Sequence, residues 1–332
     1  MSYREDFFRM LEGKTPQSDV MYYRMGVYEE EGEKSGYATV MPEISDFANI
    51  AVTGKNSWGI EHEIDVNGTG YMPRPGYFIL KDVTKWKDVV KAPYRYDYDF
   101  KAAAERDLAA QAWDPETQVA SMFGLGGGYF LQLASFMGFE GAMLAMYDEP
   151  EAVNELLTYF GDYDEWLTRN ILETYEGIDV VGFGDDNATE LNPFVSYDMF
   201  KNILLPHYKR IFDVAKDYGK IVSYHNCGRC EDFMDDFVDI GAQIWNCATP
   251  VNDLNAFKAK HDNKIILEVM PRIYPQATEA EIRQQVRDII DTYAPGGAFV
   301  WIGSASSNNP EGRAVDTWAY DEVAKYGKGF YK

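Results

Sequence analysis

The central part of the chain contains three short apolar runs, which read IDVVGFG at residues 178–184, KIVSYHN at 220–226 and AQIWNCA at 242–248. Runs of this kind are typical of strands that are buried on both faces of a parallel sheet. Further runs lie at 117–124, 264–270 and 298–304. Segments with helical spacing separate the runs, at roughly 139–174, 196–218, 231–239, 252–261 and 278–293.

An alternation of strands and helices predicts βαβ units and a parallel sheet. The six regular units, with one or two further strands upstream, bring the total to about eight. We therefore expect an α/β fold, a (β/α)8 TIM barrel with an N-terminal extension. A doubly wound open sheet is the alternative, but its dinucleotide-binding form needs a GxGxxG between the first strand and helix, which this sequence lacks.

The first part of the chain is less regular than the rest. Residues 4–12 have helical spacing, residues 55–77 resemble short strands with turns, and residues 81–110 contain two expected helices broken at Ala92-Pro93. Because no low-complexity linker interrupts the sequence, we expect one domain over residues 1–332. Its N-terminal extension and first barrel elements occupy residues 1–116, and its regular βα units occupy residues 117–332.

The composition excludes several classes of partner. The chain has 332 residues, of which 54 are acidic and 31 basic, so its formal net charge is −23. Such a surface disfavours nucleic acid and anionic membranes, which both require basic faces. The charged start of the sequence has no apolar signal-peptide core, and no run of apolar residues is long enough to span a bilayer. The three cysteines, all within residues 227–247, do not resemble a secreted disulfide framework, so we expect a cytoplasmic protein.

Potential ligands for a metal ion follow two neighbouring strands. A barrel carries its chemistry at the carboxyl ends of its strands. His225 and Cys227 are two residues apart, so they share one face of a strand. Cys247 ends the next strand, about 4.8 Å away in a parallel sheet. Imidazole and thiolate are zinc ligands, so these three residues are candidate metal ligands. The alternative is that all three are ordinary buried side chains.

Three carboxylates are candidate catalytic groups. Asp185 and Asp186 end the IDVVGFG strand, and such a pair can supply an acid at neutral pH, anchor a substrate or hydrogen-bond His225. Alternatively, they form the acidic entry to a helix. Glu268 lies within the apolar run IILEVM, where a carboxylate needs a partner. That partner could be a metal ion, a substrate or Arg272.

Two other motifs carry less weight. Cys227 and Cys230 form a CxxC, but they follow a late strand of a large chain rather than lying in a thioredoxin-like context. Residues 124–128 read GLGGG, yet no Lys-Ser/Thr follows them. We therefore interpret this segment as a closely packed turn rather than a phosphate-binding loop.

Longer segments resemble the uroporphyrinogen decarboxylase superfamily, and specifically its cobalamin-dependent methyltransferase branch. The similar segments are REDFFRMLEGKTPQSDV at 4–20, NSWGIEHE at 56–63, GFEGAMLAMYDEPEAVNELL at 138–157, GFGDD at 182–186, and YHNCG at 224–228 followed by DDFVDIGAQIWNC at 235–247. Their order along the chain is far more specific than any one of them.

The resemblance implies a TIM barrel with its site at the carboxyl ends of the strands. In the methyltransferase branch, the His and Cys that correspond to His225 and Cys227 hold zinc, and a further Cys near the last strands completes the set. Zinc acts as a Lewis acid, while a separate corrinoid protein carries the methyl group on cobalt. The implied activity moves a methyl group between a small methylated substrate and that cobalt.

One departure from the family pattern concerns the last ligand. The late Cys would fall near Gly303 and Ser304, where this sequence has no cysteine. Either Cys247, Glu268 or another group takes its place, or zinc binds weakly or not at all. We expect the substrate to be a methyl ether, because an altered ligand set suits O-demethylation better than thiol methylation.

Two alternatives remain for the activity. One is decarboxylation of a uroporphyrinogen-like substrate, a carboxy-lyase reaction. That enzyme holds its polyanionic substrate with arginines of an N-terminal segment, but the matching residues 20–30 here, VMYYRMGVYEE, contain only Arg24. The other alternative is a non-catalytic accessory barrel.

Overall fold

The protein is described by a computed structural model that covers residues 2–23, 36–65, 70–111, 113–271, 273, 277–303 and 310–332. Its main sheet consists of β1 (Met21–Tyr22), β2 (Tyr37–Val40), β5 (Val119–Phe123), β6 (Val180–Gly184), β7 (Ile221–His225), β8 (Ala242–Ala248), β9 (Ile266–Val269) and β10 (Phe299–Trp301). A separate antiparallel hairpin consists of β3 (His62–Ile64) and β4 (Tyr71–Pro73).

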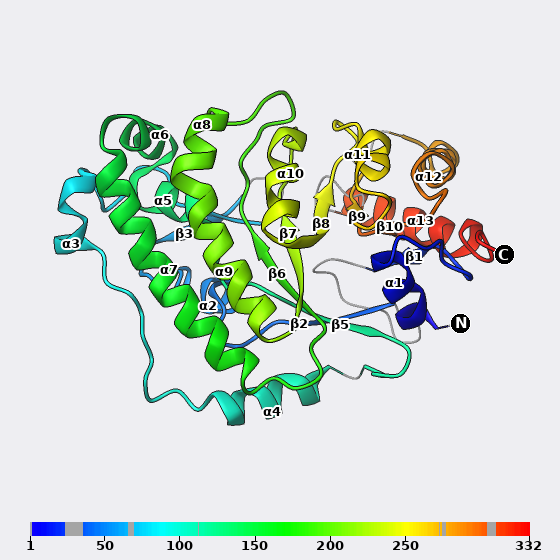
Figure 1. Cartoon of the computed structure of the whole chain (residues 1–332), viewed down its shortest axis with the longest axis horizontal. Coiled ribbons are helices and arrows are strands. Elements are labelled where there is room, and N and C mark those ends of the chain that lie inside the picture. The colour runs from blue at the N-terminus through cyan, green and yellow to red at the C-terminus, as the bar shows by residue number, and fades with distance from the viewer. Residues whose placement is uncertain are drawn as a thin grey trace.

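The strand order identifies the barrel. The eight strands pair in parallel in the order β1-β10-β9-β8-β7-β6-β5-β2. This order never reverses along the sequence, whereas a doubly wound sheet reverses at a switch point. The strands thus form a nearly closed barrel with helices around it (Figure 1). The prediction of a (β/α)8 barrel with an N-terminal extension is confirmed, and the six regular runs correspond to β5–β10.

Helices surround the barrel, and one of them closes an end of it. They are α1 (Tyr3–Leu11), α2 (Asp46–Thr53), α3 (Trp86–Val89), α4 (Phe100–Ala110), α5 (Tyr129–Met137), α6 (Phe139–Asp148), α7 (Pro150–Leu172), α8 (Tyr197–Met199), α9 (Leu205–Asp217), α10 (Glu231–Ile240), α11 (Leu254–Lys260), α12 (Glu279–Tyr293) and α13 (Pro310–Tyr326). The sequence pattern did not predict α2, α5 and α13, and it merged α6 with α7. Pro150 at the start of α7 separates these two helices, because proline fits the first turn of a helix better than its interior.

Helix α1 closes the amino-terminal end of the barrel. Ser2 and Glu5 form a capping box at its start. Phe7 and Met10 pack among the inward-facing residues of the strands, which include Val119, Val180, Ile221, Ile244, Ile266 and Val300. The Arg4 guanidinium binds the carboxylate of Asp179, with Nη2 2.7 Å from Oδ1, just before β6 begins. The opposite end of the barrel is therefore the end available to a functional site.

An aromatic cluster attaches the N-terminal extension to the outer helices. Trp58 makes edge contacts with the rings of Phe160 and Tyr163 on α7, each with centroids 5.1 Å apart. Trp86 of α3 lies 5.0 Å from Tyr159 on the same helix. Burial of such large rings is a substantial source of stability. No helix in the described part of the chain is both long and apolar enough to pass through a bilayer.

Two glycines of β6 make room inside the barrel. Residues of a strand alternate between its faces, and Val180 lies in the barrel interior, so Gly182 and Gly184 face the interior too. A Cβ on Gly182 would overlap the ring of Phe123, and one on Gly184 would lie 2.8 Å from the Cβ of His225. The absence of side chains at these positions therefore lets Phe123 and His225 turn inward.

We predict that Gly182→Ala lowers the free energy of unfolding by about 1–3 kcal/mol, because the new methyl group must displace the Phe123 ring. The control is Gly141→Ala in α6, whose Cβ would meet only Met137 Cβ, at 3.4 Å. Alanine favours a helix by up to about 1 kcal/mol over glycine, so the control should not destabilise the protein. Urea denaturation followed by circular dichroism measures both. Equal stability of Gly182→Ala and the wild type would contradict the tight packing at β6.

Candidate metal centre

Four residues on adjacent strands lie side by side near the carboxyl ends of β6, β7, β8 and β9. Gly184 of β6 is the Cα partner of His225 on β7, His225 is the partner of Asn246 on β8, and Asn246 is the partner of Glu268 on β9. Neighbours in register on parallel strands point to the same side. Because Ile221, Ile244 and Ile266 of these strands lie in the barrel interior, their alternation turns His225, Asn246 and Glu268 inward as well.

His225, Cys227 and Cys247 come together at this end of the barrel. Their potential ligand atoms all lie within 4.8 Å of one another. The Sγ of Cys227 is 3.4 Å from Nε2 of His225. The structure thus brings together the three residues that the sequence predicted as metal ligands. Among the described residues, no carboxylate belongs to this group, and Glu268 in particular lies outside it.

Cys247 reaches the cluster through an irregularity in β8. The pairing of β8 with β9 shifts between Asn246 and Ala248, so Cys247 is an additional residue, and its φ is +57°. Regular alternation would turn Cys247 away from the side that Asn246 faces. The bulge instead places both residues in the interior, where Cys247 is fully buried. A left-handed backbone at a residue other than glycine costs about 1–2 kcal/mol, and such strain is concentrated at functional sites.

The two cysteines and the histidine affect one another's protonation. The hydrogen bond from Cys247, aided by His225, outweighs burial and lowers the pKa of the Cys227 thiol to about 6. That hydrogen bond and burial hold the pKa of Cys247 well above its usual value. Burial alone would lower the pKa of His225, but the negative charge and hydrogen bond of Cys227, with the charge of Asp186, raise it to about 10. The cluster therefore favours a Cys227 thiolate, the form that binds metal ions.

The two predicted aspartates have different surroundings. Asp185 is buried and accepts hydrogen bonds from the backbone N–H groups of Phe130 (2.6 Å) and Leu131 (2.9 Å) at the start of α5, and from the Tyr208 hydroxyl (2.6 Å). Burial raises the pKa of Asp185 to about 7, although these hydrogen bonds oppose the shift. Since its oxygens are occupied by the protein, Asp185 holds α5 in place.

Asp186 instead lies beside the cluster of His225, Cys227 and Cys247. Its side chain is 39% exposed, and its Oδ1 is 3.7 Å from Nε2 of His225. The same oxygen accepts a hydrogen bond of 3.0 Å from the backbone N–H of Cys227. None of the described residues donates a hydrogen bond to its other oxygen, Oδ2. Asp186 is therefore the aspartate that a substrate at the cluster can reach.

Glu268 has protein partners on the far side of Asn246. The Tyr23 hydroxyl donates a hydrogen bond of 2.9 Å to Glu268 Oε2, and Asn246 Nδ2 donates another to the same oxygen. Burial raises the pKa of Glu268, and the hydrogen bonds from Asn246 and Tyr23 oppose that shift. Arg272, the protein partner suggested by the sequence, lies outside the described residues, as do Arg24 and Ser304.

Asn246, Tyr23 and Tyr37 were not anticipated. One signal was present for Asn246, because it is a polar residue at the end of the apolar run AQIWNCA and two positions after Ile244. The two tyrosines belong to the first, irregular part of the chain. Their rings lie 4.5 Å apart, which brings together the residue after β1 and the first residue of β2. Nothing in the local sequence predicts this contact between the two edges of the sheet.

The CxxC motif and the glycine-rich segment both have structural roles. Cys230 is buried at the start of α10, with its Sγ directed at the carbonyl groups of Asn226 and Gly228, and it does not belong to the cluster. In the glycine-rich segment, the N–H of Gly127 donates a 2.9 Å hydrogen bond to Asp164, a carboxyl whose pKa burial raises to about 7. A Cβ on Gly128 would lie 2.8 Å from a carbonyl oxygen. This segment is the closely packed turn that the sequence predicted.

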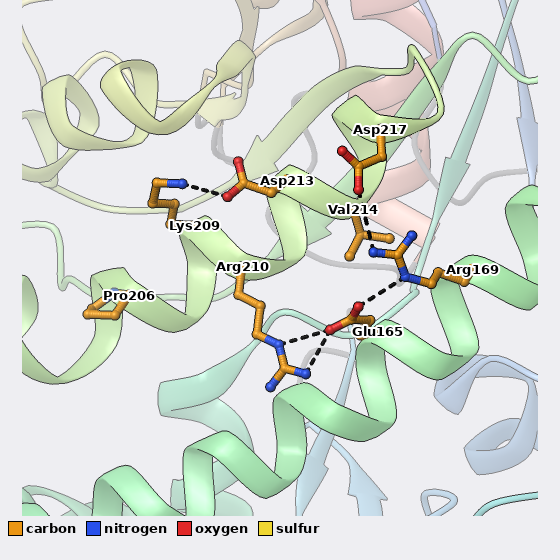
Figure 2. A pocket seen from close by; sticks show the side chains of 8 residues that line it. All are labelled: Glu165, Arg169, Pro206, Lys209, Arg210, Asp213, Val214 and Asp217. Atoms are coloured by element: carbon orange, nitrogen blue, oxygen red, sulfur yellow. Dashed lines mark hydrogen bonds and ion pairs between the residues drawn. The ribbon is translucent and has the colours of Figure 1, made fainter.

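A surface pocket of about 360 Å³ lies elsewhere, between α7 and α9 (Figure 2). Its charged groups are paired with one another: Glu165 accepts hydrogen bonds from both Arg169 and Arg210, and Lys209 pairs with Asp213. Because these charges are already compensated and no residue is shared with the cluster, we assign no ligand to this pocket.

Comparison with known proteins agrees with this architecture. Among solved structures, a methyltransferase from Methanosarcina mazei matches with a TM-score of 0.62 and 12% identity, covering 98% of this chain and 99% of that chain. A GH26-CBM35 β-(1,4)-mannanase from Podospora anserina matches less well, with a TM-score of 0.42 and 10% identity over 95% of this chain and 63% of that chain. The first match supports the barrel fold.

Sequence comparison supplies the family. A search of curated proteins finds no match to the sequence. The family model described as uroporphyrinogen decarboxylase (URO-D) matches residues 62–302, which is more than half of the chain and includes β5–β10 with the whole His225, Cys227 and Cys247 cluster. The chain therefore belongs to the uroporphyrinogen decarboxylase family.

Proposed function

We propose that the protein is a zinc-dependent methyltransferase that moves a methyl group between a small methylated substrate, preferably a methyl ether, and the cobalt of a corrinoid carried by a partner protein. The observation that carries this proposal is the convergence of one imidazole and two thiols at the carboxyl end of the barrel. A decarboxylase has no need of such a soft ligand set, whereas zinc prefers it.

The three side chains fit a zinc ion. Zinc–sulfur bonds of about 2.3 Å and zinc–nitrogen bonds of about 2.0–2.1 Å imply ligand separations of roughly 3.3–3.8 Å in a tetrahedron. The 3.4 Å between Cys227 Sγ and His225 Nε2 lies in this range, and Cys247 needs only a small movement to join them. Three protein ligands leave the fourth position for a substrate, as in catalytic zinc sites. In this proposal Cys247 replaces the late cysteine that the sequence lacks.

The chemistry divides between the metal and the chain. Zinc, when bound, supplies Lewis acidity toward an ether or thiol group of the substrate. Asp186, next to the cluster and partly exposed, can take up a proton from solvent and is placed to give it to the leaving oxygen, which is strongly basic as its carbon–oxygen bond breaks. Asp185 holds the start of α5 and so maintains the position of Asp186.

The electron balance requires the corrinoid partner. A corrinoid in the Co(I) state on the partner protein would supply the electron pair of the new carbon–cobalt bond. The pair of the broken carbon–oxygen bond stays on oxygen, which takes the proton from Asp186. The products are a methylated Co(III) corrinoid and an alcohol or phenol. Reprotonation of Asp186 from solvent is consistent with its partial exposure.

We predict that the protein purified without added zinc contains about one zinc per chain, and that Cys227→Ser and Cys247→Ser each lose most of it. Elemental analysis measures the content. Cys230→Ser is the matched control, because Cys230 is also buried and lies three residues from Cys227 but outside the cluster. Circular dichroism shows that each variant is folded. Near-zero zinc in the wild type, or equal content in all four proteins, would contradict the metal centre.

We further predict that the protein forms a methylated corrinoid when it is mixed with a Co(I) corrinoid protein and a methyl ether. The absorbance change of the corrinoid follows the reaction, with methylamines, methanol and methylated thiols as competing donors. Methylation from one of these other donors alone would keep the reaction class and exclude the methyl ether. Release of carbon dioxide from uroporphyrinogen, or no reaction with any donor, would favour the decarboxylase or the accessory barrel instead.

The role of Asp186 can be tested in the same assay. Asparagine keeps an oxygen that accepts the hydrogen bond from the Cys227 N–H but has no acidic proton. We expect Asp186→Asn to lower the rate of methyl transfer by about 10²–10⁴-fold with little change in KM. Asp198→Asn, at an exposed position on α8, is the control. A rate close to wild type in Asp186→Asn would leave Asp186 only the task of orienting Cys227.

A further inference from the structure

Asn246 lies between the proposed zinc ligand His225 and the buried carboxylate of Glu268. Its Oδ1 is 2.6 Å from Nδ1 of His225. Its Nδ2 donates hydrogen bonds to Glu268 Oε2 and, at 3.0 Å, to the Tyr23 hydroxyl oxygen. Both Asn246 and Glu268 are almost inaccessible to solvent, at 4% and 2% exposure. The three side chains thus form a continuous line across β7, β8 and β9.

The chemistry of the groups sets the direction of each hydrogen bond. Glu268 Oε2 already accepts from the Tyr23 hydroxyl, so the group of Asn246 that faces it must be the amide NH2. The carbonyl oxygen of Asn246 is then the atom that faces His225. Because that oxygen can only accept, Nδ1 of His225 must carry the proton and donate it. The other ring nitrogen, Nε2, is the one that lies 3.4 Å from Cys227.

We propose that Glu268 and Asn246 are positioning residues that fix the tautomer and the ring orientation of His225, so that Nε2 is presented to the metal ion. This inference rests on the zinc site of the proposed function. In this proposal Glu268 supports a metal ligand, and it neither binds the metal ion nor transfers a proton. The proposal also assigns a role to Asn246, which passes the effect of the carboxylate to the imidazole.

The partners of Glu268 show that it is built into the protein rather than aimed at a substrate. The Tyr23 hydroxyl, after β1, hydrogen-bonds the carboxylate, and the ring of Tyr37, at the start of β2, packs against the Tyr23 ring with centroids 4.5 Å apart. The Tyr23 backbone is itself held by the Tyr320 hydroxyl of α13, at 3.0 Å. Oε2 of this buried carboxylate thus has two protein donors, Tyr23 and Asn246, which anchor it to the chain. We call His225, Asn246 and Glu268 the relay. Through Tyr23 and Tyr37, this relay links the proposed metal centre to both edge strands of the barrel.

Cobalt(II) binding tests the relay without reference to catalysis, because cobalt(II) replaces zinc in such sites and gives a thiolate-to-metal charge-transfer band. Loss of an outer partner of a metal-bound histidine weakens affinity by about 10–100-fold. We expect this loss in Asn246→Ala, with the band still present at saturation because all three ligands remain. Glu268→Gln should keep the band and weaken binding by up to about 10-fold, since a glutamine no longer dictates how Asn246 is turned.

The matched control is Asn56→Ala. Asn56 is as buried as Asn246, at 4% exposure, and accepts a 2.9 Å hydrogen bond from the Ile60 N–H rather than from His225. It should lose stability on truncation but keep the cobalt(II) affinity of the wild type. Urea denaturation of every variant separates a general loss of stability from an effect on the metal centre.

Proton NMR of the metal-free protein gives a second readout. The Nδ1 proton of His225, held by the 2.6 Å hydrogen bond, should appear as a downfield resonance protected from exchange in the wild type and in Asn56→Ala. It should be absent in Asn246→Ala. This measurement addresses the hydrogen bond itself and does not depend on any metal.

The possible results separate the two proposals. Wild-type cobalt(II) affinity in Asn246→Ala, or in Glu268→Gln if the first variant does not fold, overturns the relay and leaves the metal centre intact. A changed shape of the charge-transfer band in Glu268→Gln also overturns the relay, because it would show that Glu268 binds the metal ion directly. No cobalt(II) binding by the wild type overturns the zinc site itself, whatever the variants do.

Discussion

The candidate site depends on the register of three neighbouring strands. His225, Asn246 and Glu268 are Cα partners across β7, β8 and β9, and their side chains make hydrogen bonds along that line. A slip of one residue in any of these pairings would turn a side chain to the opposite face of the sheet. It would also bury Glu268 among the helices without its donors, at a cost of several kcal/mol. The polar line and the apolar layer of Ile221, Ile244 and Ile266 beneath it therefore favour the same register.

A second constraint is the bulge at Cys247. In a regular strand only one of two consecutive residues faces the interior. Here both do, since Cys247 belongs to the cluster and Asn246 hydrogen-bonds His225. The left-handed backbone at Cys247 resolves this conflict at the cost of strain. The thiol then contacts the sulfur of Met270 at 3.9 Å, just beyond the end of β9. Local irregularity is thus the means by which two adjacent residues of one strand serve the same centre.

These two features also explain which parts of the molecule could be predicted from the sequence. Periodicity is a local property, so the six later strands and the common face of His225 and Cys227 were recognisable. The bulge has no local signature, because nothing in AQIWNCA distinguishes a left-handed Cys247 from an extended one. The roles of Asp185 and Asp186 diverge because α5, which was not predicted, presents its N–H groups to one of them only. Contacts of Tyr23 and Tyr37 with Glu268 join residues more than 200 positions apart, and no short-range pattern reports them.

The absence of a late cysteine has a geometric consequence for the site. All three potential ligands come from β7, β8 and the residues just after β7, so they occupy one side of the barrel opening. Gly303, which follows β10, leaves space where a side chain would stand, since a Cβ there would meet only Tyr320 and Met270, at 3.6 Å and 3.9 Å.

On another side, the ring of Phe123 packs edge-on against His225 with centroids 5.9 Å apart. Phe123 and Met270 are both half-buried, so the cluster has apolar neighbours on β5 and after β9. On these two sides the described residues offer carbon and sulfur atoms, rather than charged groups, to a substrate. Such a boundary suits a small methylated substrate, whose methyl group loses nothing by leaving water.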